Sequence, residues 1–253
     1  MKKLAVPNYV GLLVILSFAL IFVSSPAQAY VYDDFTASGY TSLWQDVGPD
    51  YGLFSQPGNG NLYFLDNSGG QIDSLASLSA VTGPFAVAMQ YLNFSATNNT
   101  TPSPGSQFVG SSVDLWIGTL GATYTHVSIY EFLNATQQGI WAVINNSGSK
   151  THIGSYVSNT ATTGWLGIVY NGMQGAAGVV TLYYDVGSGW TKFASYNPDF
   201  PAGPIYFAIE GYDPDGSYLS FQVDQVDVVP LPPSAFFLVS GLIPLAWAHR
   251  RKR

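Results

Sequence analysis

The carboxylates of this chain are the natural place to look for chemistry, and only two of them are glutamates. Cleavage of a glycosidic bond needs two carboxyl groups flanking the bond, one as acid and one as base or nucleophile. Glu131 and Glu210 lie far apart in the sequence, so a catalytic pair would have to form across strands. The sequence therefore favours a role without catalysis, with a polysaccharide-active glycoside hydrolase or lyase as the alternative.

Serine hydrolase and nucleotide chemistry have no support in the sequence. There is no G-x-S-x-G motif, and His126 and His152 are the only histidines between residues 30 and 229. A histidine in such a setting is more typical of a hydrogen-bonded strand residue than of a general base. The chain also lacks the glycine patterns that hold phosphates or dinucleotides. We predict no catalytic residue, and no cofactor other than calcium.

Aromatic residues give the strongest indication of a binding surface. In a strand predicted from 123 to 132, the two-residue period separates one face (Tyr124, His126, Ser128, Tyr130) from the other (Thr123, Thr125, Val127, Ile129, Glu131). A strip of tyrosine, histidine and serine can stack on a sugar ring and hydrogen-bond its hydroxyls. We name Tyr124, His126, Tyr130 and Trp141 as candidate ligand-binding residues. The alternative is that these tyrosines are ordinary strand residues, with a packed ring and a wet hydroxyl.

A candidate calcium site is the stretch Asp213-Pro214-Asp215-Gly216-Ser217. Calcium prefers several oxygen ligands, and Asp213 and Asp215 would supply two carboxylates beside backbone carbonyls. The stretch lacks the third acidic or amide residue and the distal glutamate of an EF-hand loop. The alternative is an ordinary Asp-Gly turn between two strands.

The elements that position these residues are predicted to be strands. Apolar and aromatic runs alternate with turn clusters every 8–15 residues or so, and no long amphipathic helix occurs between residues 30 and 229. This pattern is typical of a single all-β domain, a two-sheet antiparallel sandwich or jelly roll, with most tryptophans in its core. The predicted strands include 85–91, 112–117, 123–132, 139–144, 164–170, 179–185, 190–196, 206–212 and 219–229.

The charge distribution excludes nucleic acid as a partner. All 15 acidic residues lie between residues 30 and 229, where Lys150 and Lys192 are the only basic ones. Binding to phosphate backbones needs many more cations than this. The chain has no cysteine, so it has neither a disulfide framework nor a thiolate metal site.

The N-terminus has the three parts of a secretory signal peptide. Lys2 and Lys3 precede an apolar run from 10 to 23, and Ala27-Gln28-Ala29 fits an A-x-A cleavage site. We predict cleavage after Ala29, so that residues 1–29 are removed. The alternative, an uncleaved membrane anchor, would need a run of about 20 apolar residues.

The C-terminus consists of a proline segment, an apolar run and a basic end. The segment 229–233 is Val-Pro-Leu-Pro-Pro, and the run from 235 to 248 is interrupted by Gly241 and Pro244. The basic end includes Arg250, Arg251 and Arg253. A short apolar run before a basic end is expected to pause in the membrane with the basic residues in the cytoplasm.

This order of parts resembles the PEP-CTERM sorting signal in its VPLP variant. The resemblance covers the last 25 residues, VPLPPSAFFLVSGLIPLAWAHRRKR, with Pro230 and Pro232 in the proline motif. It implies a bacterial protein that is processed by an exosortase, a membrane protease, and that reaches the cell surface or the extracellular matrix of a biofilm. Leu231 stands where the commonest form of the motif has glutamate. A plain tail anchor is the alternative.

The middle of the chain resembles concanavalin A-like, or laminin-G-like, jelly-roll domains. The resemblance rests on the order of short pieces from Asp33-Asp34-Phe35 to Phe221-Gln222-Val223-Asp224-Gln225-Val226. It implies that the first and last strands pair. Members of this fold include glycan-binding modules and glycosidases, so the fold does not settle function. The E-x-D-x-x-E motif of the jelly-roll glucanases is absent from this chain.

Together these patterns predict a secreted bacterial surface or matrix protein with three segments. Residues 1–29 form the signal peptide, residues 30–229 a non-catalytic jelly-roll domain, and residues 230–253 the sorting signal with a short transmembrane helix. The expected partners are signal peptidase, an exosortase-type protease and exopolysaccharide or another glycan. A purely structural, membrane-anchored surface protein is a further alternative.

The segment assignment predicts two processing events. We expect protein extracted from the cell surface to begin at Tyr30 and to lack the residues beyond about Pro230–Pro233, because the apolar run is shorter than the roughly 20 residues of a stable membrane span. Intact-mass analysis of the extracted protein measures both ends. A species that begins at Tyr30 and still ends at Arg253 would contradict the sorting prediction and leave a tail-anchored protein.

Overall fold

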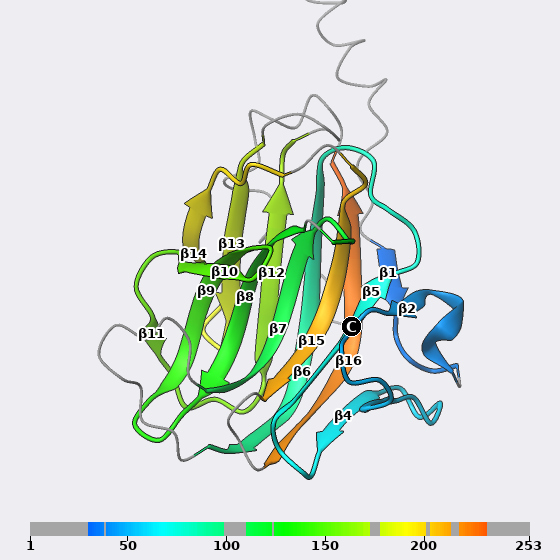
Figure 1. Ribbon diagram of the computed structural model, residues 1–253, viewed down its shortest axis with the longest axis vertical. Coiled ribbons are helices and arrows are strands. Elements are labelled where there is room, and N and C mark those ends of the chain that lie inside the picture. The colour runs from blue at the N-terminus through cyan, green and yellow to red at the C-terminus, as the bar shows by residue number, and fades with distance from the viewer. Residues whose placement is uncertain are drawn as a thin grey trace, which may run out of the picture.

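The protein folds into two β-sheets that pack face to face (Figure 1). The computed structural model describes residues 30–37, 39–98, 110–122, 124–172, 178–200, 203–213 and 218–231. Within these residues, each sheet has eight strands and every strand pair is antiparallel. The predicted all-β, two-sheet architecture is therefore confirmed.

In both sheets the order of strands in space differs from their order along the chain. Sheet A runs through β14 (Thr191–Tyr196), β13 (Val180–Asp185), β12 (Gly164–Tyr170), β6 (Phe85–Thr97), β16 (Tyr218–Pro230), β4 (Leu62–Asp66) and β3 (Phe54–Ser55), with β1 (Tyr30–Asp33) beside β16. Sheet B runs through β10 (Ser149–His152), β9 (Gln138–Asn146), β8 (Thr125–Leu133), β7 (Ser111–Gly118), β15 (Tyr206–Asp213), β5 (Gln71–Ser77) and β2 (Trp44–Asp46), with β11 (Val157–Ser158) beside β9. One short 3-10 helix, η1 (Tyr40–Ser42), precedes β2.

The pairing of first and last strands is confirmed by β1 and β16, where Tyr30 lies opposite Val228. The predicted hairpin of β13 and β14 also forms. β16 extends one residue past the predicted domain boundary, and the Leu231 N–H donates to the Pro84 carbonyl at 2.9 Å. The first part of the proline motif thus belongs to sheet A.

Several predicted features lie outside the described residues. They are the signal peptide with Ala27 and Ala29, the second turn aspartate Asp215, and the sorting signal from Pro232 onward with Arg250, Arg251 and Arg253. Among the residues that are described, no helix has the length and apolar character needed to cross a membrane.

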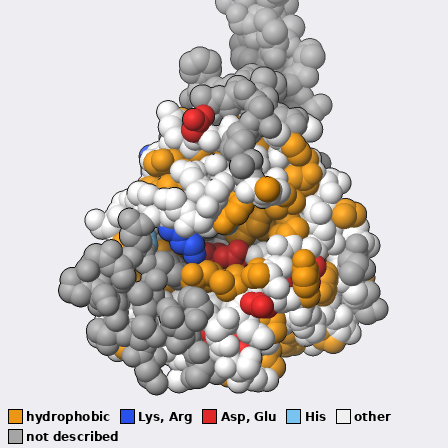
Figure 2. Space-filling view, viewed as in Figure 1, with side chains coloured by type: hydrophobic (Ala, Val, Ile, Leu, Met, Phe, Trp, Pro, Cys, Tyr) orange, Lys and Arg blue, Asp and Glu red, His pale blue; other side chains and the backbone are white. Residues whose placement is uncertain are grey.

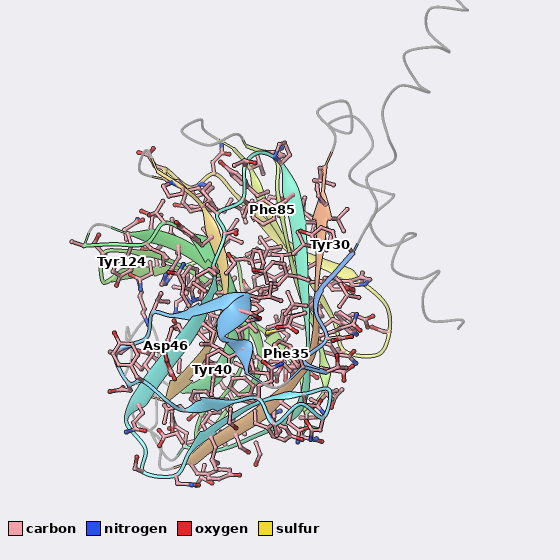
Figure 3. All side chains as sticks on the ribbon, turned by 90° about the vertical axis from the view of Figure 1, so that its right-hand side faces the viewer. Tyr30, Phe35, Tyr40, Asp46, Phe85 and Tyr124 are labelled. Carbon is pink, nitrogen blue, oxygen red and sulfur yellow. The ribbon has the colours of Figure 1, made fainter. Side chains whose placement is uncertain are left out.

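The core fills the space between the two sheets (Figure 3). Strand alternation sends every second residue inward, so Leu115 and Ile117 of β7 meet Ile168 of β12 in one cluster of buried apolar side chains. The Phe64 and Phe221 rings stack with their centroids 4.9 Å apart. A Cβ at position 211 would lie 2.3 Å from the Phe64 ring, so glycine is required there.

One carboxylate also lies in this interior. Glu131 is 0 % exposed, and burial raises its pKa to about 8 from its ordinary 4.5. Its Oε2 accepts hydrogen bonds from the Asn159 amide at 2.8 Å and the Tyr91 hydroxyl at 3.2 Å. The Gln138 amide lies 3.5 Å from Oε1. These donors lower the cost of a buried carboxyl group but do not offset its desolvation.

This interior carboxyl predicts a pH-dependent stability. Below about pH 4.5 both the folded and the unfolded chain hold the proton, and as the pH rises toward 8 the unfolded chain releases it first. The free energy of unfolding therefore falls through this window. The Glu131→Gln variant keeps the acceptor oxygen but cannot ionise, so it should be more stable than the wild type above pH 8, by roughly 3–5 kcal/mol.

Thermal unfolding of both proteins across this pH range measures the effect. The two melting temperatures should converge near pH 4.5. A difference that is the same at every pH would show that Glu131 does not titrate inside the fold.

Candidate functional site

The outer face of sheet B, which points away from sheet A, carries the residues that alternate with the core. Glu210 of β15 lies between Ser74 of β5 and Asp114 of β7 in the strand register. Trp116, the next outward residue of β7, lies between Ala208 and Ser128. Since side chains at directly opposed positions are close neighbours, this register gathers polar and aromatic groups in the middle of the face.

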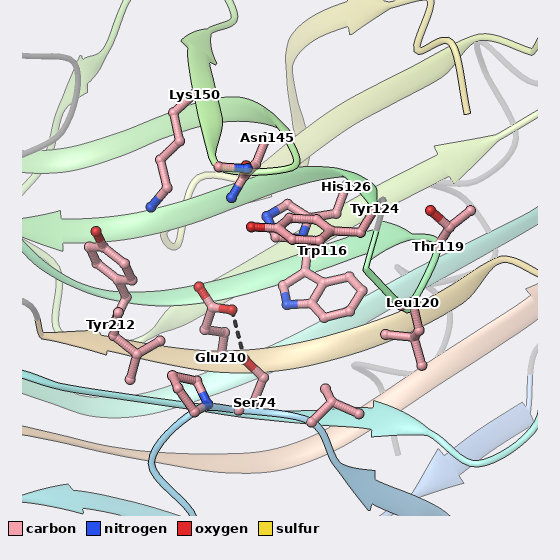
Figure 4. Close-up of a pocket in the computed structure, with 16 residues that line it drawn as sticks. Ser74, Trp116, Thr119, Leu120, Tyr124, His126, Asn145, Lys150, Glu210 and Tyr212 are labelled. Carbon is pink, nitrogen blue, oxygen red and sulfur yellow. Dashed lines mark hydrogen bonds between the residues drawn. The ribbon is translucent and has the colours of Figure 1, made fainter. Parts of the chain in front are cut away.

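A pocket of about 580 Å³ opens over these strands. Figure 2 looks onto this face and shows a hollow in which a basic side chain lies beside acidic ones. The close-up in Figure 4 draws the lining residues. They are Val47, Gly48, Pro49, Ile72, Ser74, Trp116, Thr119, Leu120, Gly121, Tyr124, His126, Asn145, Gly148, Lys150, Glu210 and Tyr212.

Three aromatic rings form one wall of the pocket. The His126 ring stacks on Trp116 with the centroids 5.0 Å apart and on Tyr124 with the centroids 5.4 Å apart. The planes are tilted by only 29° and 30°. Burial lowers the pKa of His126 to about 3, with a smaller contribution from the nearby Lys150 cation. The imidazole is therefore neutral, and the wall is an uncharged aromatic surface.

An acidic pair lies at the floor. Glu210 accepts a hydrogen bond from the Ser74 hydroxyl at 2.7 Å (Figure 4), and Asp114 accepts one from Ser112 at 2.5 Å. Burial raises the pKa of both carboxyls, and the charge of Glu210 raises that of Asp114 further. Glu210 lines the pocket, whereas its cross-strand neighbour Asp114 is only 4 % exposed and is not among the lining residues.

Two donors face the Glu210 carboxylate. The Lys150 ammonium lies 3.8 Å from the centre of the Tyr212 ring, and its charge opposes the rise in the pKa of Glu210. The Trp116 indole N–H also favours the charged form of Glu210, more weakly. That contact falls short of a standard hydrogen bond, and the buried N–H has no other partner among the described residues. A ligand in this pocket could therefore meet the Lys150 ammonium as a donor and the Glu210 carboxylate as an acceptor, whereas the Trp116 N–H is itself buried.

The predicted aromatic strip is split by the structure. Its two-residue alternation is correct, and Tyr124 and His126 line the pocket. Tyr130 is fully buried and does not line it, and Trp141 belongs to a separate cluster with Phe132 and Tyr156. Trp141 stacks on His152 with the ring centroids 3.6 Å apart.

The predicted calcium ligand Asp213 is the last residue of β15 rather than a turn residue, and it is 0 % exposed. Its Oδ1 accepts a hydrogen bond from Ser111 Oγ at 2.5 Å, and that hydroxyl accepts one from Asn98. Asp215 lies outside the described residues. Within the part of the chain that is described, no three His, Asp or Glu side chains gather as a metal site.

Sequence reasoning did not name Trp116, Glu210 or Lys150 as site residues, and it weighed Glu210 only as part of a catalytic pair with Glu131. A signal for the first two was present, because Ser112, Asp114 and Trp116 alternate along one predicted strand and Ala208, Glu210 and Tyr212 along another. What the sequence lacked was the register that places these two strands side by side.

The comparisons with known proteins identify the fold. No family model matches the chain, and no curated protein matches it. Among solved structures, the exoplasmic/lumenal domain of VIP36, bound to Ca²⁺ and Man3GlcNAc, has a TM-score of 0.55 at 12% identity, covering 82% of this chain and 90% of its own. The potassium-bound carbohydrate recognition domain of Emp46p has a TM-score of 0.51 at 10% identity, covering 79% and 95%.

A glycosyl hydrolase family protein from Mycobacterium fortuitum is similar to the same extent. It has a TM-score of 0.50 at 16% identity and covers 79% of this chain and 97% of its own. The chain thus has the lectin-like jelly-roll sandwich fold. Because this fold occurs both in carbohydrate recognition domains and in a glycosyl hydrolase family protein, it leaves the activity to be argued from the pocket.

The pocket predicts a histidine that does not titrate near neutrality. The ring signals of His126 should stay at their neutral-form NMR shifts throughout the range in which an exposed histidine, with a pKa of about 6.5, becomes charged. The His126→Gln variant assigns the signal. A midpoint near 6.5 for that signal would mean that the ring is solvated and that the aromatic wall is not packed as described.

Proposed function

We propose that the pocket on the outer face of sheet B binds a sugar and that the protein is a non-catalytic glycan-binding module. The observation that carries the proposal is the stacked wall of Trp116, His126 and Tyr124 beside the Glu210 carboxylate. Sugar rings present apolar C–H faces to aromatic rings, while their hydroxyls pair with charged and amide groups. A volume of about 580 Å³ lies within the range of small-ligand sites.

A glycoside hydrolase is the second candidate, and one observation favours it. The pKa of Glu210 is raised, which is a property of general acids in glycosidases. A hydrolase also needs a second carboxylate facing the substrate. Asp114, the nearest acid in the register, lies opposite Glu210 on the adjacent strand but is only 4 % exposed and does not line the pocket. The binding role is therefore the better supported of the two.

The same proposal includes a location at the cell surface. The sequence patterns of residues 1–29 and 230–253 support secretion, membrane retention and processing by signal peptidase and an exosortase-type protease. The ligand would then be exopolysaccharide or another surface glycan. A role for calcium is also part of the proposal, because the similar VIP36 domain is bound to Ca²⁺, and it is tested by adding calcium or chelator to the binding experiment.

A glycan array probed with the full chain in mild detergent tests the binding role. Tyr124→Ala removes one stacking ring, worth about 1 kcal/mol, and should weaken the retained glycan severalfold. Tyr196→Ala, on β14 of sheet A, is the matched control and should bind like the wild type. Absence of binding to every glycan, or equal loss in both variants, would refute the proposed site.

Release of reducing sugar from the retained glycan separates the two candidate functions. The binding role predicts no turnover in the wild type. Turnover that Glu210→Gln abolishes would instead establish the hydrolase.

A further inference from the structure

We propose that the protein has a second sugar site, a groove on the outer face of sheet A that takes an uncharged glycan. The inference rests on the proposed glycan-binding function and adds a site with its own ligand class. The groove has a volume of about 460 Å³ and is formed by β3, β4, β6, β16 and the turn before β4. We call it the sheet A groove, and it shares no lining residue with the pocket on sheet B.

The strand register explains why polar side chains gather in this groove. Tyr63 of β4 lies opposite Ser55 of β3 on one side and opposite Gln222 of β16 on the other. The neighbouring residues Phe64 and Phe221 point into the core, where their rings stack. Because side chains alternate along a strand, Tyr63 and Gln222 point outward. An aromatic ring, an amide and a hydroxyl therefore lie in one row across the outer face.

A β-bulge adds a second amide to this face. One residue separates Ser220 from Gln222 on β16, whereas two residues, Asn93 and Phe94, separate their partners on β6. Phe94 is 2 % exposed and packs in the core, while Asn93 is exposed and has a φ of 54°. Asparagine adopts this left-handed conformation more readily than most residues, and bulges re-aim side chains beside binding sites. The extra residue places Asn93 in the groove.

The bulge is held by the loop that precedes β12. The Phe94 N–H donates to the Thr162 carbonyl at 2.8 Å. The Asn93 N–H donates to Thr163 Oγ1 at 3.4 Å. The backbone that carries the Asn93 side chain is therefore fixed from behind, and the left-handed conformation is kept without help from a ligand.

The aromatic ring of the groove is also held in place. The Asn59 amide, in the turn before β4, donates to the Tyr63 hydroxyl at 2.8 Å. Because the hydroxyl oxygen accepts this bond, its own O–H remains able to donate to a ligand oxygen. A ring that is positioned before the ligand arrives loses less conformational freedom on binding.

The chemistry of the lining favours an uncharged ligand. None of the residues that line the groove is Asp, Glu, Lys, Arg or His. A tyrosine ring packs against the C–H face of a sugar, and side-chain amides both donate to and accept from its hydroxyls. A uronate, sulfate or phosphate group would meet no cation among these lining residues, whereas the sheet B pocket contains Lys150 and Glu210. Binding in the groove should therefore be insensitive to salt.

The two sites lie on opposite outer faces of the sandwich, with the core between them. A glycan in one site is therefore separated from a glycan in the other by both sheets, and one protein can hold two chains at once. Trp165 and Trp190, which also lie on sheet A, line neither site.

An array of uncharged glycans, probed with the full chain in mild detergent at low and high salt, tests the second site. Asn93→Gly deletes the amide but keeps the bulge, because glycine adopts a positive φ freely. Tyr63→Ala deletes the ring. Each should weaken the retention of a glycan held in the groove severalfold at both salt concentrations. Tyr51→Ala removes a tyrosine that is 72 % exposed and lines neither site, so this control should bind like the wild type.

The outcomes separate this inference from the proposed function, which Tyr124→Ala tests. A glycan whose retention falls in Asn93→Gly and Tyr63→Ala but persists in Tyr124→Ala supports the second site. Retention of every glycan unchanged in Asn93→Gly would overturn the second site, whatever Tyr63→Ala does, and would leave the sheet B pocket standing if Tyr124→Ala binds less. Loss of the groove-dependent retention at high salt would also overturn it. Retention that never depends on Tyr124 would count against the sheet B pocket alone.

Discussion

The strands of sheet B must all point their apolar residues into the interior that they share with sheet A, because the fold buries its apolar side chains between the two sheets. Val127, Ile129 and Leu115 are fully buried there. Because side chains alternate between the two faces of a strand, the residues between them point outward. A slip of one residue in β7 or β15 would exchange Trp116 and Glu210 for core residues, so the packing of the core also fixes the pocket.

The two glutamates illustrate what this constraint does to chemically similar residues. Glu131 points inward from β8 and is held by amide and hydroxyl donors in the core. Glu210 points outward from β15 and faces the pocket beside Lys150 and Trp116. Burial raises the pKa of both carboxyls. Of the two, only Glu210 lines the pocket and can contact a ligand there. In this fold a raised pKa therefore indicates burial, and it indicates function only where the carboxyl group also lines a pocket.

Much of the architecture can be predicted from the sequence, because turn clusters and the alternation of inward and outward residues are local signals. They predicted β12 at its observed bounds, the β13–β14 hairpin, and the faces of β8. They did not predict the neighbours of each strand, which depend on contacts between residues far apart in the chain. For this reason Glu210 could not be placed beside Trp116, and Tyr130 could not be recognised as covered by its neighbours.

Tryptophan shows the same limit in another way. Expecting most tryptophans in the core is right for Trp44, which is 1 % exposed and donates its indole N–H to Asp33. Trp116 is almost as buried, yet it belongs to the outer face and lines the pocket. Trp165 and Trp190 pack on the outer face of sheet A and do not line the pocket. Burial alone therefore does not separate a core ring from a binding-site ring.

The indole N–H signals of these tryptophans provide the most direct test of where a glycan binds. Two-dimensional NMR of the protein is recorded with increasing amounts of the glycan that an array retains, and a Trp116→Phe variant assigns the signal from the pocket. Because the Trp116 N–H faces the floor without a standard hydrogen bond, its signal should shift most, while those of Trp165 and Trp190 stay in place. A shift of the Trp165 and Trp190 signals with Trp116 unchanged would contradict the account and move the binding surface to sheet A.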